Sequence, residues 1–216
     1  SPITADRLVQ ENVGLDAVVM GEQDIYWIET RPTEQGRNVI VRIPPAGSAE
    51  DLLPAPYNAR SRANEYGGAP YWLAGDHVVF SNDNDRRLYA LVAGKAPEPI
   101  TPVGSFHYAD GTWDAGRERV ICVREDHSNP DREPVNTIVA VSLAAGGADP
   151  VVLAGGHDFC SSPRLSPDGS RLAWLTWDHP NMPWDGTELW QAAVRADGTL
   201  GAPARVAGGP AESVFQ

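Results

Sequence analysis

The chain has 216 residues, of which 42% are hydrophobic and 21% charged, so it is long and apolar enough to bury the core of one large or two small domains. Its net charge of −12 argues against a nucleic-acid groove or an anionic membrane surface as the main partner. The sequence contains no run of about 18 apolar residues, which excludes a transmembrane helix.

The chain opens with a segment, residues 1–16, in which one short helix is expected, with Thr4 capping a turn or two that ends near Gln10. Its start, "SPITADRLVQ", lacks the basic and apolar regions of a secretory signal. Cys122 and Cys160 each lie in or beside an apolar run, a pattern typical of buried free thiols in a reducing compartment rather than of a disulfide. A cytoplasmic location is therefore expected.

The remainder of the chain repeats one pattern of short strand-like runs. Four runs resemble one another and begin 52, 42 and 52 residues apart: "IYWIE" 25–29, "HVVFS" 77–81, "RVICV" 119–123 and "RLAWL" 171–175. Each follows a turn signal such as "SPDGS" 166–170, where Asp-Gly is hairpin chemistry rather than a calcium or catalytic site. Each is followed by a longer apolar run and then a short one, and the later three are preceded by a further candidate strand.

Four short strands in every 42–52 residues are the pattern of a β-propeller blade. Period-two alternation and frequent Gly and Pro agree with it. An immunoglobulin-like sandwich is the competing all-β fold, but it does not explain the period. The sequence therefore predicts an all-β propeller with four-stranded antiparallel blades, about four of them present. The expected blades are 17–56, 57–104, 105–156 and 157–209.

The last residues, 210–216, are expected to start a further blade. An array that stops there would leave unprotected strand edges at both ends, which is a liability in a free-standing protein. The expectation is that the chain belongs to a larger ring in a longer polypeptide.

Strands in a blade alternate in direction, so the loops between strands two and three share one face with the connections between blades. The unusual segments all fall in this class: "YNARSRANEYGG" 57–68, "EDHSNPDREP" 125–134 and "WDHPNMPWDG" 177–186. Two Asp-His pairs, 126–127 and 178–179, recur one blade apart. Their recurrence favours a structural hydrogen bond repeated from blade to blade over a ligand site.

Several segments together resemble the amino-terminal propeller of bacterial prolyl oligopeptidase-family serine peptidases, in the dipeptidyl aminopeptidase/acylaminoacyl-peptidase branch. They are "SPITA" 1–5, "GRNVIVR" 36–42, "YNARSRANEYGGAPYW" 57–72, "REDHSNPDREPVNTIVAV" 124–141 and "HDFCSSPRLSPDGSRLAWLTWDHPNMPWDGTELW" 157–190. The chain departs from the family where Asn64 replaces the usual His and Ala69 a third Gly.

The resemblance implies a propeller that caps an α/β-hydrolase domain carrying Ser, Asp and His, with the serine on a Gly-x-Ser-x-Gly turn. No serine of this chain has glycine at both −2 and +2, so no catalytic residue is expected within it. The implied partners are a C-terminal hydrolase domain, in the same polypeptide or a cleaved chain, and a short peptide substrate. A homo-oligomer is left open.

One face of the family's propeller meets the hydrolase domain and helps to enclose the substrate. The elaborate loops supply the candidates for that cavity or the interdomain contact: Arg62, Glu65, Asp178, His179, Trp184 and Asp185. An interblade salt bridge among Arg60, Arg62 and Glu65 is the competing structural interpretation, and for Trp184 it is local packing. Trp177, which ends a strand, is expected to pack within its blade. No third ligand is spaced for a metal, so no metal and no cofactor are expected.

The function predicted from these observations is the substrate-gating portion of a serine peptidase that hydrolyses short peptides. The alternative is a non-catalytic TolB-like or WD40-like propeller that binds a protein on its elaborate face. A glycosidase that pairs Asp178 with Asp185 is a weaker hypothesis, because seven residues in one loop do not assure the ~5–9 Å separation of carboxylates that such chemistry requires.

Overall fold

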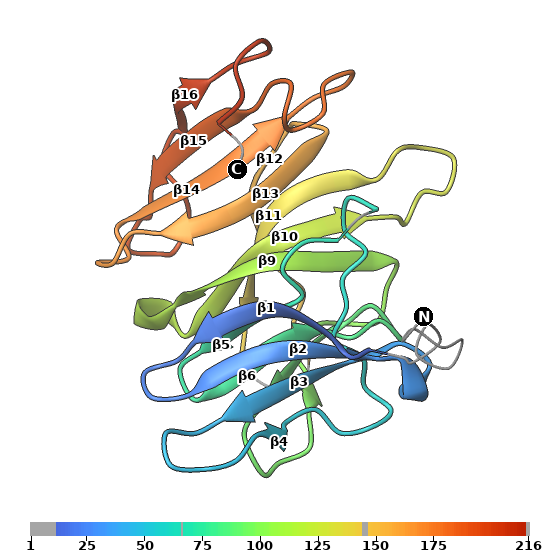
Figure 1. Ribbon diagram of the computed structural model, residues 1–216. Coiled ribbons are helices and arrows are strands. Elements are labelled where there is room, and N and C mark those ends of the chain that lie inside the picture. Colours follow the sequence, from blue (N-terminus) through green and yellow to red (C-terminus); the bar gives the residue numbers. More distant parts are fainter. Residues whose placement is uncertain (1–11, 66, 144–146, 215–216) are drawn as a thin grey trace, which may run out of the picture. The chain divides into compact units, whose positions relative to one another are not determined.

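The computed structural model describes residues 12–65, 67–143 and 147–214, and these residues form four four-stranded antiparallel sheets (Figure 1). The only helical elements among them are two single-turn 3-10 helices, η1 (Pro32–Glu34) and η2 (Ala115–Arg117). No helix in this part of the chain is long and apolar enough to span a membrane. The predicted all-β class and four-stranded sheets are confirmed. The helix expected near residues 4–10 lies outside the described residues.

The chain divides into two compact units, residues 1–59 and 60–216. The first unit holds one sheet, in the order β1 (Gly14–Met20), β2 (Ile25–Arg31), β3 (Arg37–Ile43) and β4 (Glu50–Asp51). This sheet begins three residues before position 17.

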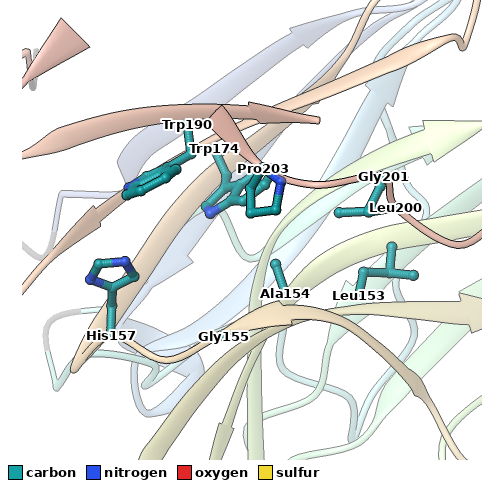
Figure 2. Close-up of a pocket in the computed structure, with 9 residues that line it drawn as sticks. All are labelled: Leu153, Ala154, Gly155, His157, Trp174, Trp190, Leu200, Gly201 and Pro203. Carbon is teal, nitrogen blue, oxygen red and sulfur yellow. The ribbon is translucent and has the colours of Figure 1, made fainter. Parts of the chain in front are cut away.

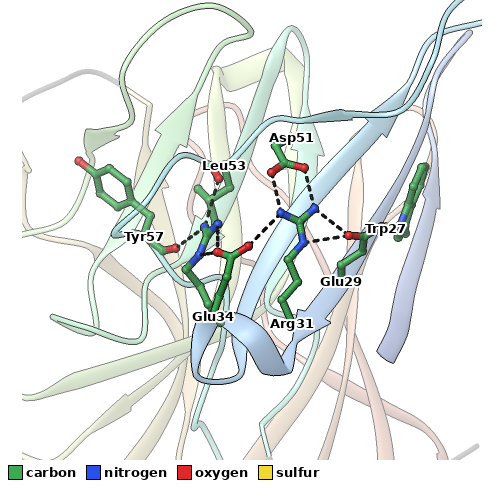
Figure 3. A network of polar contacts seen from close by, with 8 residues as sticks. Trp27, Glu29, Arg31, Glu34, Asp51, Leu53 and Tyr57 are labelled. Atoms are coloured by element: carbon green, nitrogen blue, oxygen red, sulfur yellow. Dashed lines mark hydrogen bonds and ion pairs between the residues drawn. The ribbon is translucent and has the colours of Figure 1, made fainter. Parts of the chain in front are cut away.

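One face of the first sheet carries a network of ion pairs (Figure 3). The guanidinium of Arg31 donates to Glu29 at 2.7 Å and to both carboxylate oxygens of Asp51 at 2.6 Å. Arg37 donates to Glu34 at 2.7 Å and to the backbone oxygens of Leu53 and Tyr57. The hydrogen bond from Arg31 holds the pKa of Asp51 below its ordinary value. These bonds tie the segment after β3 to the sheet.

The second unit contains three sheets, each of which pairs its strands in chain order. The first of them comprises β5 (Tyr71–Ala74), β6 (His77–Ser81), β7 (Leu88–Leu91) and β8 (Glu98–Pro99). The next comprises β9 (Phe106–Asp114), β10 (Arg119–Asp126), β11 (Val135–Ser142) and β12 (Val151–Gly155). The last comprises β13 (Phe159–Leu165), β14 (Arg171–Trp177), β15 (Glu188–Ala193) and β16 (Ala204–Gly208).

The three sheets pack face to face, and β10 shows why its sequence is a continuous apolar run. Val120 and Cys122 point into a core shared with β5, β6 and β7, whereas Ile121 and Val123 point into a core shared with β13, β14 and β15. A strand buried on both faces needs apolar residues at every position. Gly111 in β9 is required by this packing, because a Cβ there would lie 1.8 Å from the Trp72 ring.

The short turns of the second unit, such as residues 115–118 and 166–170, lie at one end of it. We call this end the turn end. In "SPDGS" the amide of Gly169 donates to the Ser166 carbonyl at 2.8 Å, and Gly169 has the positive φ of 67° that the hairpin requires. The predicted turn is therefore confirmed. The Asp168 carboxylate accepts from Ser166 and Ser170, which lowers its pKa to about 2.

Candidate functional site

The elaborate loops of the second unit gather at the opposite end, which we call the loop end: residues 60–65, 67–69, 127–134 and 178–187. Asp110, at the centre of β9, links this strand to the two neighbouring sheets. Its carboxylate accepts the Ala69 amide at 2.7 Å, in the segment before β5, and the Ser162 amide at 3.1 Å, in β13. One carboxylate therefore links β9 to β13 and to the segment that leads into β5.

The segment 60–65 is fastened to β9 and β10 rather than standing free. Ser61 Oγ donates to the Tyr108 carbonyl at 2.7 Å, and the Asn64 amide donates to Glu125 Oε1 at 3.2 Å. Asn64 and Glu65 both adopt left-handed backbone conformations, with φ of 53° and 63°. Non-glycine residues seldom do so without fixed contacts, which these hydrogen bonds supply.

Two of the six candidate residues lie on this segment, and the ion pair suggested for them does not form. Arg62 pairs with Asp83, in the loop after β6, through contacts of 2.8 and 3.2 Å. The bond lowers the pKa of Asp83 and fixes the guanidinium. The alternative interpretation, an interblade salt bridge among Arg60, Arg62 and Glu65, is therefore wrong for Arg62. The carboxylate that pairs with its guanidinium is that of Asp83. Glu65 is exposed.

Asp178 and His179 take part in a crossed pair of Asp-His contacts with the residues before β13. The ring Nδ1 of His157 lies 2.8 Å from Asp178, and that of His179 lies 2.9 Å from Asp158. The Asp158 carboxylate also accepts the backbone amide of His179 at 2.8 Å, which is the main reason why its pKa is lowered. These contacts fix the entry and exit of the first hairpin of this sheet.

The corresponding Asp-His pair of the previous sheet does not repeat these bonds. Asp126 accepts the Ser128 amide in a local turn, and His127 contacts Glu125 instead of an aspartate. The expectation of one hydrogen bond repeated from blade to blade is therefore wrong. The two loops differ in length, and each closes on its own neighbours.

Trp184 and Asp185 lie in the loop between β14 and β15. The indole of Trp184 is 62% exposed, and the carboxylate of Asp185 accepts the Met182 amide at 3.1 Å, which makes a tight turn. The loop is clamped to the C-terminal segment, because Asn181 donates to the Pro210 carbonyl at 2.9 Å and Ser213 donates to that of Pro183 at 2.8 Å. A rigid loop therefore presents Trp184 to its surroundings. Trp177, in contrast, is buried, as predicted.

Sequence reasoning missed a cluster formed by His107, Glu125 and His127. Glu125 Oε2 lies 3.1 Å from Nδ1 of His107 and 2.8 Å from Nε2 of His127. Burial raises the pKa of Glu125, but its hydrogen bonds to the two histidines outweigh burial and leave that pKa below the ordinary value. His107 lies 20 residues from His127 in the chain, and only the pairing of β9 with β10 brings them together. The expectation that no third ligand is spaced for a metal is therefore wrong, because these three residues bring three donor atoms together.

Two cavities of the second unit are lined by none of the six candidates, although His157 at the rim of the first contacts Asp178. One, of about 140 Å³, lies beside β12, β14 and β15 and is lined by Trp174, Trp190, Leu153 and Leu200 with His157 at its rim (Figure 2). The other, of about 520 Å³, lies at the turn end, near Arg117 and Asp168. The loop end is instead a surface of carboxylates, imidazoles and one exposed indole. It can bind or enclose a ligand but presents no activated nucleophile.

Solved structures with strong similarity to this chain include two puromycin-hydrolysing enzymes. Over 98% of its length the chain matches a puromycin-hydrolysing peptidase of Mycobacterium tuberculosis, at 38% identity and a TM-score of 0.88. It matches the crystal structure of puromycin hydrolase at 35% identity, with the same coverage and TM-score. The chain spans only 35% of the length of each of these proteins.

A third match, TolB from Acinetobacter baumannii, has a TM-score of 0.55 at 14% identity over 85% of this chain and 43% of that one. Such a distant likeness supports the propeller fold and nothing further. No family model matches the chain, and no curated protein matches it.

Proposed function

We propose, from the homology of this chain to the propeller portion of puromycin-hydrolysing peptidases in the prolyl oligopeptidase family, that it is the substrate-gating part of a serine peptidase. The single observation that carries the proposal is the match of 98% of this chain to 35% of an enzyme at 38% identity. The rest of such an enzyme would supply the catalytic α/β-hydrolase domain.

The proposed substrates are short peptides, together with compounds like puromycin, for whose hydrolysis the two relatives are named. Acyl transfer needs a nucleophile, a base and an oxyanion hole. This chain has no Gly-x-Ser-x-Gly turn, so the nucleophile would come from the remainder of the enzyme. The blade boundaries given above, a larger ring and a cytoplasmic location are part of the same proposal.

The loop end would then face the catalytic domain and the bound substrate. Trp184 supports this role, because an exposed indole on a clamped loop offers a large contact area at little cost in entropy. The same wall would carry the polar side chains of Glu65, Asp178, His179 and Asp185. The guanidinium of Arg62 is instead paired with Asp83. The alternative, a TolB-like binding scaffold, has weaker support, since that likeness shows the fold alone.

The test assays the 216-residue chain and the full-length product of its gene against aminoacyl and dipeptidyl chromogenic substrates and against puromycin. The proposal predicts hydrolysis by the full-length protein, sensitivity to a serine-directed inhibitor, and no hydrolysis by the chain alone. Hydrolysis by the chain alone, or a full-length protein without activity, would overturn it.

A further inference from the structure

The cluster at the end of β9 and β10 combines the donor atoms that transition metals prefer. His107, Glu125 and His127 each offer one ligand atom, and these atoms all lie within 4.8 Å of one another. The set is the only one of its kind among the residues that the structure describes. Two imidazoles and one carboxylate form a common ligand set for zinc sites that keep a fourth position open.

Two of the three spacings between these atoms are close to what zinc requires. Bonds of about 2.0–2.2 Å at tetrahedral angles place neighbouring ligand atoms about 3.3 Å apart. The Glu125 oxygen lies 3.1 Å from the His107 nitrogen and 2.8 Å from the His127 nitrogen. Shifts of a few tenths of an ångström would bring these two separations to the tetrahedral value, and the two histidine nitrogens lie within 4.8 Å of each other. The His127 side chain is 36% exposed, which gives an ion access from solvent.

The neighbouring sheet shows that the fold does not need these residue types. His107 pairs with Glu125 across β9 and β10, as Phe159 pairs with Trp177 across β13 and β14. His127 and His179 each follow two residues later. At the β13–β14 positions an aromatic stack, with ring centroids 5.2 Å apart, fills the space. Aromatic rings therefore suffice to fill this place in the fold, and packing alone does not require two imidazoles and a carboxylate here.

When no metal is bound, Arg86 determines which ring nitrogen of His107 carries the proton. Its guanidinium nitrogen lies 2.7 Å from Nε2 of His107. A guanidinium can only donate, so Nε2 accepts and the proton resides on Nδ1, which donates to Glu125. A metal bound at Nδ1 would move that proton to Nε2, where Arg86 must withdraw. Arg86 is therefore a competitor of the metal, and its replacement provides a sensitive test.

We propose that His107, Glu125 and His127 bind one divalent transition-metal ion, with Zn²⁺ as the best fit. The inference does not depend on the proposed peptidase function, because it uses only residues of this chain. Its structural consequence falls on the segment 60–65, since the second oxygen of Glu125 accepts the Asn64 amide at 3.2 Å. Metal binding would fix Glu125 and slow hydrogen exchange at Asn64.

The experiment titrates Zn²⁺ by calorimetry into the chelator-treated chain at neutral pH. The expected result is one site. His107→Gln, Glu125→Gln and His127→Gln should each lower the affinity by more than the roughly 10- to 100-fold that loss of an outer hydrogen-bond partner costs. The matched control is His179→Gln, which changes the equivalent histidine of the next sheet and should leave the affinity unchanged. Co²⁺ should give the intense visible absorption of a four-coordinate site.

Arg86→Gln supplies a second, gain-of-binding test that does not depend on a destabilised variant. The glutamine oxygen can accept the Nε2 proton of a metal-bound His107, so the affinity should rise by about tenfold. The proposal is overturned if Zn²⁺ does not bind, if binding survives in folded His107→Gln and Glu125→Gln variants, or if Arg86→Gln gives no gain. Loss of binding in His179→Gln would also overturn it, since the ion would then lie in the Asp158–His179 network.

Discussion

The β9–β12 and β13–β16 sheets use the same positions at the loop end for different purposes. In β13–β16 an aromatic stack of Phe159 and Trp177 fills the space between the strand ends. In β9–β12 the same positions hold His107 and the buried carboxylate of Glu125. Because both arrangements fit one fold, the strand pairing does not depend on which of the two sets of side chains occupies these positions.

The largest expected effect is the removal of the packing residue in β14. Trp177→Ala should lower the free energy of unfolding by about 3–5 kcal/mol, because it leaves a large cavity beside Phe159. Urea unfolding measures the change. Trp184→Ala is the matched control, and as an exposed residue it should change stability by less than about 0.5 kcal/mol. Equal losses in both variants would contradict the assignment of Trp177 to the core.

Glu125→Gln should have a smaller effect, a loss of about 1.5–3 kcal/mol, because hydrogen bonds from two imidazoles to a charged acceptor are weakened. Hydrogen exchange at the Asn64 amide should also become faster, since that amide donates to Glu125. Glu133→Gln, an exposed residue of the following loop, serves as control. Unchanged exchange at Asn64 in the Glu125 variant would show that the segment 60–65 is held by other contacts.

The crossed Asp-His contacts of β13–β16 should contribute less still, because they are half exposed. Asp158→Asn should cost less than about 1 kcal/mol. The folded protein lowers the pKa of Asp158, so its contribution is present above the ordinary pKa and is lost as the pH falls through the folded value. Unfolding of wild type and variant between pH 7 and pH 2 should therefore converge in acid. A difference that persists at pH 2 would contradict this.

The smallest effect is expected in the interior, where the two sheets are alike. Cys122 in β10 and Cys160 in β13 are both free and buried. Burial raises the pKa of both thiols, that of Cys160 to about 12. Neither should react with a thiol reagent in the native protein at pH 8, and both should react after unfolding. Rapid native reaction of one cysteine alone would show that one interior opens more readily.

The fold could be predicted from the sequence because it depends on local, repeated signals. The runs of β6, β10 and β14 recur with their turns, and the period of their starts determines the fold class. The burial of Trp177 could be predicted because its place at the end of a strand follows from the same pattern.

The partners of the loop residues could not be predicted in this way. Arg62 pairs with Asp83, which lies in a different loop, and His179 contacts Asp158 across a hairpin. His107 joins Glu125 only through strand register, which a bulge in β9 shifts. A search for Asp, Glu or His at the paired ends of neighbouring strands would have found this cluster.

We propose that the loop end, and not the turn end, meets the substrate and the catalytic domain of a peptidase. Steady-state kinetics of the full-length protein tests it most directly, with Trp184→Ala and Asp185→Asn at the loop end and Asp197→Asn, in the turn between β15 and β16, at the other. The two loop-end changes should lower kcat/KM on aminoacyl substrates, and Asp197→Asn should leave it unchanged. A loss confined to Asp197→Asn would contradict it.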